Sequence, residues 1–259
     1  MKTFDTHAHL FWSDFDKDRD EVINRAAEHG VTGILNLGTT VESSQACIAL
    51  AQKYTHCHAA IGFHPNDVEI FAVDPDENIS RLLSLAQQPE VVAVGETGLD
   101  FFRGRDTEKV QVLSLHAHFD LARRTGLPIV LHNRSADEEL KDFLEEYGSD
   151  VTAILHCFTG EEKFGLWAIE RGHYLGLGGI FTFPSCDLPD MVKSWDLDHL
   201  LLETDSPFLS PVPFRGKRNE PSHVIHTARA IAEAVGITTE ELGEITTANA
   251  CRVLGLPGK

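Results

Sequence analysis

The chain has 259 residues, of which 42% are hydrophobic, and its 22 basic and 40 acidic residues give a formal net charge of −18. This acid excess argues against a broad groove for duplex nucleic acid, because phosphate binding normally requires a basic face. No run reaches the ~18 apolar residues of a membrane span and the polar first residues lack a secretory pattern, so we expect no membrane partner. Five scattered cysteines without a CxxC pair predict free thiols and a cytoplasmic protein. We also expect no obligate protein partner.

Strand-like runs alternate with amphipathic stretches along the whole chain. Strands are predicted at residues 3–7, 31–37, 57–63, 91–96, 128–132, 151–156, 174–180 and 199–203. Helices are predicted at residues 18–29, 41–54, 77–87, 107–125, 136–147, 161–171, 188–194, 222–235 and 240–254. A capping box of Thr238 and Glu241 opens the last of these helices.

This alternation predicts parallel strands joined by right-handed crossovers. The mean spacing of about 30 residues is the length of one βα unit. The repeated units therefore predict an α/β fold of the (β/α)₈ TIM-barrel class, formed as one domain by residues 1–259. The alternative is an open doubly wound sheet. Such a sheet usually carries a glycine-rich phosphate loop after its first strand, where this chain has a His-x-His segment.

Metal-binding side chains stand where five of the predicted strands end. His7 and His9 are two residues apart on the first strand, so their side chains leave the same face. The ends of strands four, five, six and eight carry Glu96, His132, His156 and Asp205. In barrel enzymes these strand ends form the catalytic face. Burying this mixed set of nitrogen and oxygen ligands would be costly unless it bound metal, and two cations sharing Glu96 would use all of its members.

Further candidates would contact the substrate. His64 follows the third strand, and Arg103 and Arg134 follow strands four and five. The loop after strand eight carries Arg215, Lys217 and Arg218 between prolines, which is typical of a phosphate-facing loop. The alternative is a solvated loop whose prolines only fix its path. His116 and His118 lie within a predicted helix and are interpreted as surface or packing residues, and Cys157 is interpreted as a packing residue. The other histidines are expected on the side of the barrel away from catalysis.

A series of motifs in the chain closely resembles the TatD family of metal-dependent deoxyribonucleases, within the amidohydrolase-like superfamily. The motifs are Asp5-Thr6-His7-Ala8-His9, Gly95-Glu96-Thr97-Gly98-Leu99-Asp100-Phe101-Phe102-Arg103, Leu131-His132-Asn133-Arg134, His156-Cys157-Phe158-Thr159-Gly160, Leu202-Glu203-Thr204-Asp205-Ser206-Pro207 and Arg215-Gly216-Lys217-Arg218-Asn219-Glu220-Pro221. They cover essentially the whole chain in the family's order. Asn133-Arg134-Ser135-Ala136 departs from the usual Ser-Arg-Asp-Ala, and His118 stands where glutamine is common, but no ligand is lost.

The resemblance implies a barrel with two cations and hydrolysis of DNA, often from the 3′ ends of single strands, supported by magnesium or manganese. If the family's ligand positions apply to the matching residues of this chain, one ion would be held by His7, His9, Glu96 and Asp205, and the other by Glu96, His132 and His156. Glu96 would then be shared, and DNA ends, or RNA ends, would be the substrate. Histidine-rich coordination by itself favours zinc, iron or manganese over magnesium.

The ligand set suggests a mechanism in which two cations lower the pKa of a shared water and Asp205 accepts its proton or orients the hydroxide. Arg134 or the loop of residues 215–218 would stabilise the charge that develops at phosphorus. One alternative is hydrolysis of an amide, ester or lactone of a small molecule. Such barrel amidohydrolases commonly bridge their metals with a lysine, whereas Glu96 takes that place here. A second alternative is a non-catalytic adaptor, which the intact candidate ligands disfavour.

Overall fold

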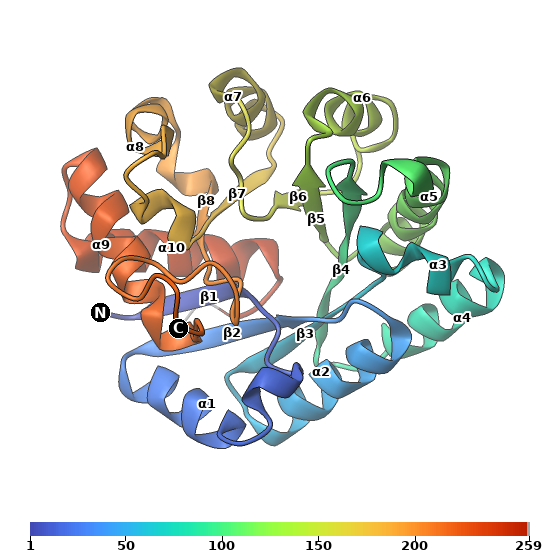
Figure 1. The fold of residues 1–259 in the computed structure, drawn as a ribbon, viewed down its shortest axis with the longest axis horizontal. Coiled ribbons are helices and arrows are strands. Elements are labelled where there is room, and N and C mark those ends of the chain that lie inside the picture. The colour runs from blue at the N-terminus through green and yellow to red at the C-terminus, as the bar shows by residue number, and fades with distance from the viewer. Residues whose placement is uncertain (258–259) are drawn as a thin grey trace. The chain divides into compact units, whose positions relative to one another are not determined.

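The computed structural model describes residues 1–257, in which strands and helices alternate as expected (Figure 1). The strands of this part of the chain are β1 (Thr3–Ala8), β2 (Val31–Leu37), β3 (Cys57–Ile61), β4 (Val91–Asp100), β5 (Ile129–Arg134), β6 (Ala153–Leu155), β7 (Tyr174–Leu177) and β8 (Leu200–Leu202). Its helices are α1 (Arg19–Glu28), α2 (Val41–Lys53), α3 (Val68–Phe71), α4 (Pro75–Leu85), α5 (Glu108–Thr125), α6 (Asp137–Tyr147), α7 (Glu162–Glu170), α8 (Leu188–Met191), α9 (Val224–Val235) and α10 (Thr239–Val253).

The strands form one eight-stranded sheet in chain order, from β1 to β8, which is the topology of a (β/α)₈ barrel. The predicted fold class is therefore confirmed. The chain divides into two compact units, one of residues 1–36 together with residues from 157 onward and one of residues 37–156. The single domain over residues 1–259 stays a prediction. Within residues 1–257, none of the helices combines the length and the apolar character that crossing a membrane would require.

In the first unit, the last strand lies beside the first. β7 pairs with β8 and β1 with β2, all in parallel, and a parallel bridge joins Ser206, beyond β8, to Ala8 at the end of β1. Every residue of β1 is buried. This explains why polar side chains on β1 need partners from within the protein. The segment that follows β8 supplies them, because it runs along the end of β1.

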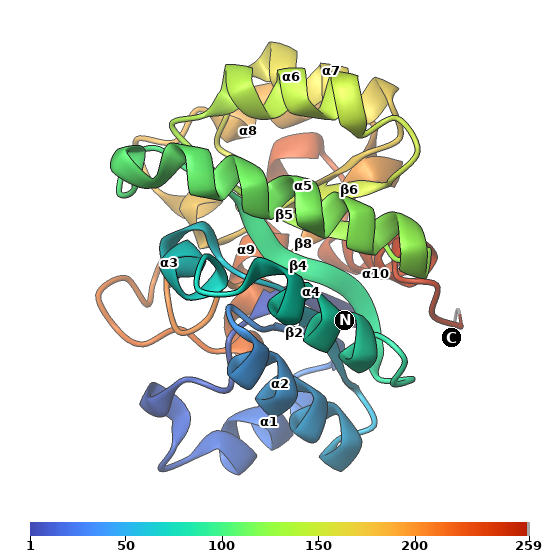
Figure 2. The ribbon, with the colours of Figure 1, turned by 90° about the vertical axis from the view of Figure 1, so that its right-hand side faces the viewer.

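In the second unit, β3, β4, β5 and β6 pair in parallel in chain order. Helix α5 packs against β4 (Figure 2). All ten residues of β4 are buried, as expected for a central strand covered on both faces.

Several strand bounds differ from the prediction. β6 and β8 are shorter than expected, and β7 ends at Leu177, where the chain turns into a short 3₁₀ segment (Gly179–Thr182). β4 is longer, because it continues past residue 96 to Asp100. At Gly98, φ is +137° and a Cβ atom would lie 2.0 Å from the backbone oxygen of His132. Glycine at this position thus does not end the strand but allows β4 to approach β5 closely, where Gly98 pairs with His132.

We expect Gly98→Ala to destabilise the protein more than Gly126→Ala does. Gly126 also has a positive φ, of +70°, but no atom lies within 4 Å of its hypothetical Cβ, so only the left-handed backbone is penalised, by roughly 1–2 kcal/mol. At Gly98 the collision with β5 adds to that penalty, by at least ~1 kcal/mol. Urea unfolding of both variants measures the difference, and equal losses would contradict the close-approach explanation.

Candidate metal centre

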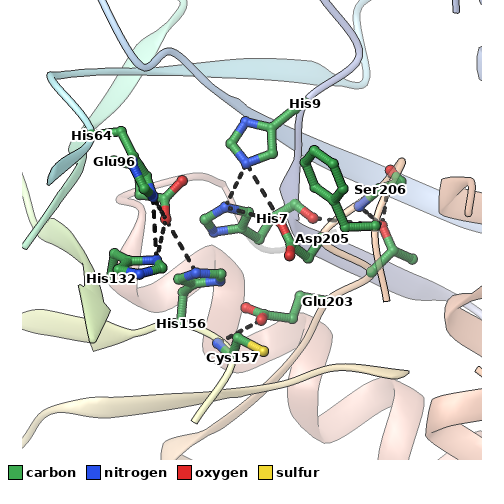
Figure 3. A network of polar contacts seen from close by, with 12 residues as sticks. His7, His9, His64, Glu96, His132, His156, Cys157, Glu203, Asp205 and Ser206 are labelled. Atoms are coloured by element: carbon green, nitrogen blue, oxygen red, sulfur yellow. Dashed lines mark hydrogen bonds and ion pairs between the residues drawn. The ribbon is translucent and has the colours of Figure 1, made fainter. Parts of the chain in front are cut away.

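Two imidazoles and a carboxylate converge in the first unit. His7 and His9 lie at the end of β1, and Asp205 follows β8 (Figure 3). The Nε2 atoms of His7 and His9 are 3.2 Å apart. Asp205 Oδ1 lies 3.7 Å from His7 Nε2 and 3.5 Å from His9 Nε2. We call this group the His7–His9–Asp205 cluster.

Backbone bonds hold this cluster together. The N–H of Asp205 donates to the carbonyl of His7 over 2.8 Å, and the N–H of His9 donates to the carbonyl of Ser206 over 2.8 Å. Asp205 itself has a φ of 55°, an uncommon conformation for a non-glycine residue. The two segments therefore bring the histidines and the aspartate together through main-chain contacts on both sides of the cluster.

Asp5, on β1, accepts hydrogen bonds from both of these segments. Its Oδ1 accepts from the N–H of Thr204 at 2.9 Å and from the N–H of His7 at 3.3 Å, and its Oδ2 accepts from the Thr204 hydroxyl at 2.6 Å. Complete burial raises the pKa of Asp5 to about 8, although the hydrogen bonds from Thr204 and His7 oppose this shift. Asp5 was not among the predicted site residues. The signal that could have found it is a carboxylate two positions before a histidine, on a strand that is otherwise buried.

A second cluster forms in the other unit around Glu96, which lies on β4 with an exposed side-chain fraction of only 2%. Its Oε1 is 3.1 Å from His132 Nδ1 on β5 and 3.1 Å from His156 Nε2, just after β6 (Figure 3). We call these three residues the Glu96 cluster. One carboxylate oxygen thus faces the imidazole nitrogens of two histidines, one on β5 and one just after the neighbouring strand β6.

Asp100, at the end of β4, orients one of these imidazoles. Its Oδ2 lies 3.3 Å from His132 Nε2, so that Nδ1 is the ring nitrogen that faces Glu96. Burial alone would raise the pKa of Asp100, but His132, the backbone N–H of Arg103 and the charge of Arg134 lower it to about 2. Burial works in the opposite direction on His132, whose pKa is nevertheless raised by Asp100 and Glu96. A carboxylate behind a histidine in this way is typical of metal-ligating imidazoles.

His64 follows β3 and faces the Glu96 cluster as a hydrogen-bond donor. Its Nδ1 accepts from the N–H of Asn66 at 3.0 Å, so in the neutral ring the proton is carried by Nε2. That Nε2 lies 3.5 Å from Glu96 Oε1 and 3.3 Å from His132 Nδ1. In this tautomer His64 can donate a hydrogen bond toward the cluster, and its Nε2 also lies within ligand distance of Glu96 and His132.

The basic residues predicted to contact substrate have protein neighbours of their own. Arg218 forms a two-pronged ion pair with Asp18, at 2.8 and 2.6 Å. The guanidinium of Arg215 lies 4.0 Å from the ring centroid of Phe183, and Lys217 Nζ lies 5.9 Å from that of Phe214. Arg134 covers Phe102, with 4.0 Å to its ring centroid, and Arg103 is exposed. Their contacts with substrate stay a prediction.

Glu203 was also missed, although its motif was noted. This carboxylate is fully buried, and its Oε1 accepts from the backbone N–H of Cys157 at 2.6 Å (Figure 3). Cys157 has a φ of 47°, which turns its N–H toward the acid. The cysteine therefore contributes its backbone N–H to the contact with Glu203.

The donor sets of both clusters fit divalent cations. Two neutral imidazole nitrogens that face each other can share only one proton, whereas both can offer lone pairs to one ion. Metal–nitrogen bonds of ~2.0–2.1 Å place neighbouring ligand atoms ~2.8–3.4 Å apart in octahedral or tetrahedral geometry. The spacings of 3.1–3.7 Å within the two clusters are close to this range. The ligand atoms of His7, His9 and Asp205 lie close enough together to hold one metal ion, and so do those of Glu96, His132 and His64. His156 Nε2 is equally close to Glu96 Oε1.

His118, on α5, supports the segment that carries His64. Its Nε2 accepts from the N–H of Phe63 at 3.0 Å, and its Nδ1 lies 2.7 Å from the carbonyl of Ser114, to which it donates. Complete burial lowers the pKa of His118 to about 4, against the opposing effect of Ser114. His118 is thus a neutral structural histidine, in agreement with its interpretation as a packing residue.

We expect His118→Gln to weaken the acid sensitivity of the fold. Since the folded-state pKa of about 4 lies below the ordinary histidine value of 6.5, the unfolded chain binds a proton first, and stability falls as the pH drops from 6.5 to 4. The loss attributable to this group is on the order of 3 kcal/mol. Glutamine can accept and donate at the same positions without titrating. Urea unfolding in chelator at pH 7.5 and pH 4.5 tests this expectation, and an unchanged pH dependence would refute it.

The chain matches known proteins over nearly its full length. The family model described as "TatD related DNase" matches residues 4–255. The chain is 40% identical to the "uncharacterized metal-dependent hydrolase YabD" of Bacillus subtilis, over 96% of this chain and 98% of that protein. It is 36% identical to the "3'-5' ssDNA/RNA exonuclease TatD" of Salmonella typhimurium, over 95% of this chain and 96% of that protein.

A solved structure supports the same relationship. The TatD homologue YjjV of Escherichia coli superposes with a TM-score of 0.91 and 28% sequence identity, with 98% of each chain covered. The resemblance inferred from the motifs is thereby confirmed. Together with the two clusters, these matches show that the chain belongs to the TatD family of metal-dependent hydrolases.

Proposed function

We propose that this hydrolase cleaves phosphodiester bonds at the 3′ ends of single-stranded DNA or RNA with two bound divalent cations. The observation that carries the proposal is the pair of buried clusters, each with imidazole nitrogens directed at a carboxylate oxygen. Relatives about one-third identical over nearly their whole length are named as 3′–5′ single-strand exonucleases. Residues 1–259 would act as one catalytic domain, since each unit supplies only part of the ligand set.

In this proposal His7, His9, Glu96 and Asp205 hold one cation, and Glu96, His132 and His156 hold the other. When bound, the cations supply an activated water and neutralise charge on the phosphate. The histidine-rich ligand set favours manganese, zinc or iron on chemical grounds, while the family resemblance favours magnesium or manganese. Manganese satisfies both arguments. The cytoplasmic location remains a prediction.

The chain's own residues perform the proton transfers and the orientation of the substrate. Asp205 is the most exposed member of its cluster, at 13% of its side chain against 0% and 5% for His7 and His9, and it accepts the proton of the attacking water. His64 carries its proton on Nε2 and donates it in a hydrogen bond to a phosphate oxygen. Arg134 adds positive charge near the phosphate. Glu96 occupies the position where amidohydrolases commonly place a bridging lysine, which disfavours amide or lactone hydrolysis.

We expect Asp205→Asn and Glu96→Gln each to lower turnover of a labelled single strand by about 10²–10⁴-fold, because general-base catalysis and metal binding are lost. Asp190→Asn is the matched control, since this exposed aspartate on α8 pairs only with Lys193 among the ion pairs of the described residues. Product-end mapping after chelation and readdition of each metal identifies the polarity and the effective cation. Full activity of both variants would end the proposal, and hydrolysis of amides or lactones instead would support the alternative function.

Asp100→Asn should weaken binding at the Glu96 cluster. The amide keeps the shape of the side chain but loses the charge that faces His132 Nε2 across 3.3 Å. Removal of such partners typically lowers metal affinity by ~10–100-fold. Calorimetric titration of the chelated protein with Mn²⁺ should show one weakened site and one unchanged site. Equal weakening of both sites, or of neither, would contradict the orienting role of Asp100.

A further inference from the structure

Three aromatic residues border the His7–His9–Asp205 cluster. Phe11 and Trp12 follow His9 in sequence, and Phe208 lies three residues beyond Asp205. The rings of Trp12 and Phe208 meet edge to face, with centroids 5.5 Å apart, and His9 has ring contacts of 5.9 Å with Phe11 and 6.3 Å with Phe208. We call Phe11, Trp12 and Phe208 the aromatic platform. Two of its rings, those of Phe11 and Phe208, contact the imidazole of His9 in the candidate metal centre.

Two members of the aromatic platform are exposed, Trp12 at 38% and Phe208 at 43%. Large apolar side chains gathered at an active site, rather than scattered singly, indicate a binding surface. Trp12 also differs from the other two tryptophans of the chain, Trp167 and Trp195, which are 9% and 5% exposed. The exposed rings are therefore available to a ligand at the edge of the cluster.

The backbone that carries the platform is fixed in place. The guanidinium of Arg19 donates to the carbonyls of Leu10 and Trp12, at 2.6 and 3.1 Å. On the other side, the Asn219 amide donates to the carbonyls of Thr204 and Phe208, at 2.8 and 2.7 Å. A surface that is ordered before binding loses less entropy when a ligand settles on it.

Charge around the platform determines the kind of ligand. Arg19 is engaged with Asp16 at 2.6 Å and with backbone carbonyls, and Arg218 is engaged with Asp18 at 2.6 Å. These guanidinium groups are already neutralised, and the whole chain has a net charge of −18. A polyanionic ligand at the platform therefore gains little from these two side chains and needs another source of affinity. The flat, uncharged rings of such a ligand can supply this affinity by stacking on aromatic side chains.

We propose that Trp12 and Phe208 form a stacking site for a nucleobase of the single-stranded substrate, next to the phosphate handled by the His7–His9–Asp205 cluster. This inference rests on the proposed function and names the part of the nucleic acid that this site recognises. Stacking uses the face of the base, which all bases possess, so the site selects unpaired strands without selecting sequence. A base within a duplex has no free face to offer.

The test is a double comparison of protein and ligand. One strand of about ten nucleotides carries all its bases, and a second has abasic residues at its 3′ end; both have cleavage-resistant phosphorothioate linkages and are added to the Mn²⁺-loaded protein. Trp12→Ala should weaken binding of the base-bearing strand by roughly 5–50-fold, and binding of the abasic strand by less than about twofold. Trp12→Phe should restore most of the affinity. Leu113→Ala, which alters an exposed residue on α5, should change neither.

Tryptophan fluorescence gives a second readout that does not depend on activity. The base-bearing strand should quench the emission of the wild-type protein, and Trp12→Phe should abolish the quenching, since Trp167 and Trp195 are buried. Equal loss of affinity for both strands in Trp12→Ala, or quenching that persists in Trp12→Phe, would overturn the stacking site while leaving nuclease activity intact. If the wild-type protein neither binds nor cleaves any strand, the proposed function falls and the stacking site falls with it.

Discussion

The structure depends on the burial of acidic groups beside imidazoles rather than beside lysine or arginine. Glu96 is 2% exposed, and its nearest partners are imidazoles rather than lysine or arginine. Desolvation would make a lone carboxylate in such a place strongly unfavourable. A bound cation would offset this desolvation penalty. It would also raise the free energy of unfolding, since a ligand that binds the folded state favours that state. A cation bound by these groups would therefore be expected to stabilise the folded state.

The second requirement is that the ligands be held before a cation arrives. Asp5 does this for the His7–His9–Asp205 cluster, because one buried carboxylate receives N–H groups from both the β1 and the post-β8 segments. Asp100 does it for His132 through the far nitrogen of the ring. In both cases a carboxylate outside the cluster fixes a residue inside it. This arrangement limits the freedom that the ligands would otherwise lose on binding, and it explains why two carboxyl groups outside the proposed ligand sets are buried so deeply.

The sequence predicted the fold and the ligand candidates because both follow from local patterns. The alternation of strands and helices, and histidines or acids at strand ends, are visible residue by residue, and the capping box of Thr238 and Glu241 is present as expected. The bracing residues could not be found in this way. Asp5 acquires its role from Thr204, 199 positions away in the chain, and the tautomer of His64 depends on a backbone N–H in the following turn. The extension of β4 to Asp100 was missed for a related reason: Gly98 indicates a strand end by propensity, but serves here to admit the backbone of β5.

An acidic chain can be compatible with a nucleic-acid substrate if the positive charge that attracts phosphate is confined to the metal centre and the rest of the surface contributes little. With 40 acidic and 22 basic residues, most of the surface repels a phosphate backbone. Arg218, which the sequence analysis assigned to phosphate contact, is paired with Asp18, and Arg25 is paired with Glu220. Favourable charge would then be concentrated at bound cations and at the few basic side chains near them, so a strand would gain little until one of its phosphates enters the centre. Duplex DNA, which relies on many simultaneous phosphate contacts, is disfavoured by this arrangement. A single-stranded end needs only one phosphate at the metals and one base on an aromatic ring, which is the combination that an acidic surface still permits.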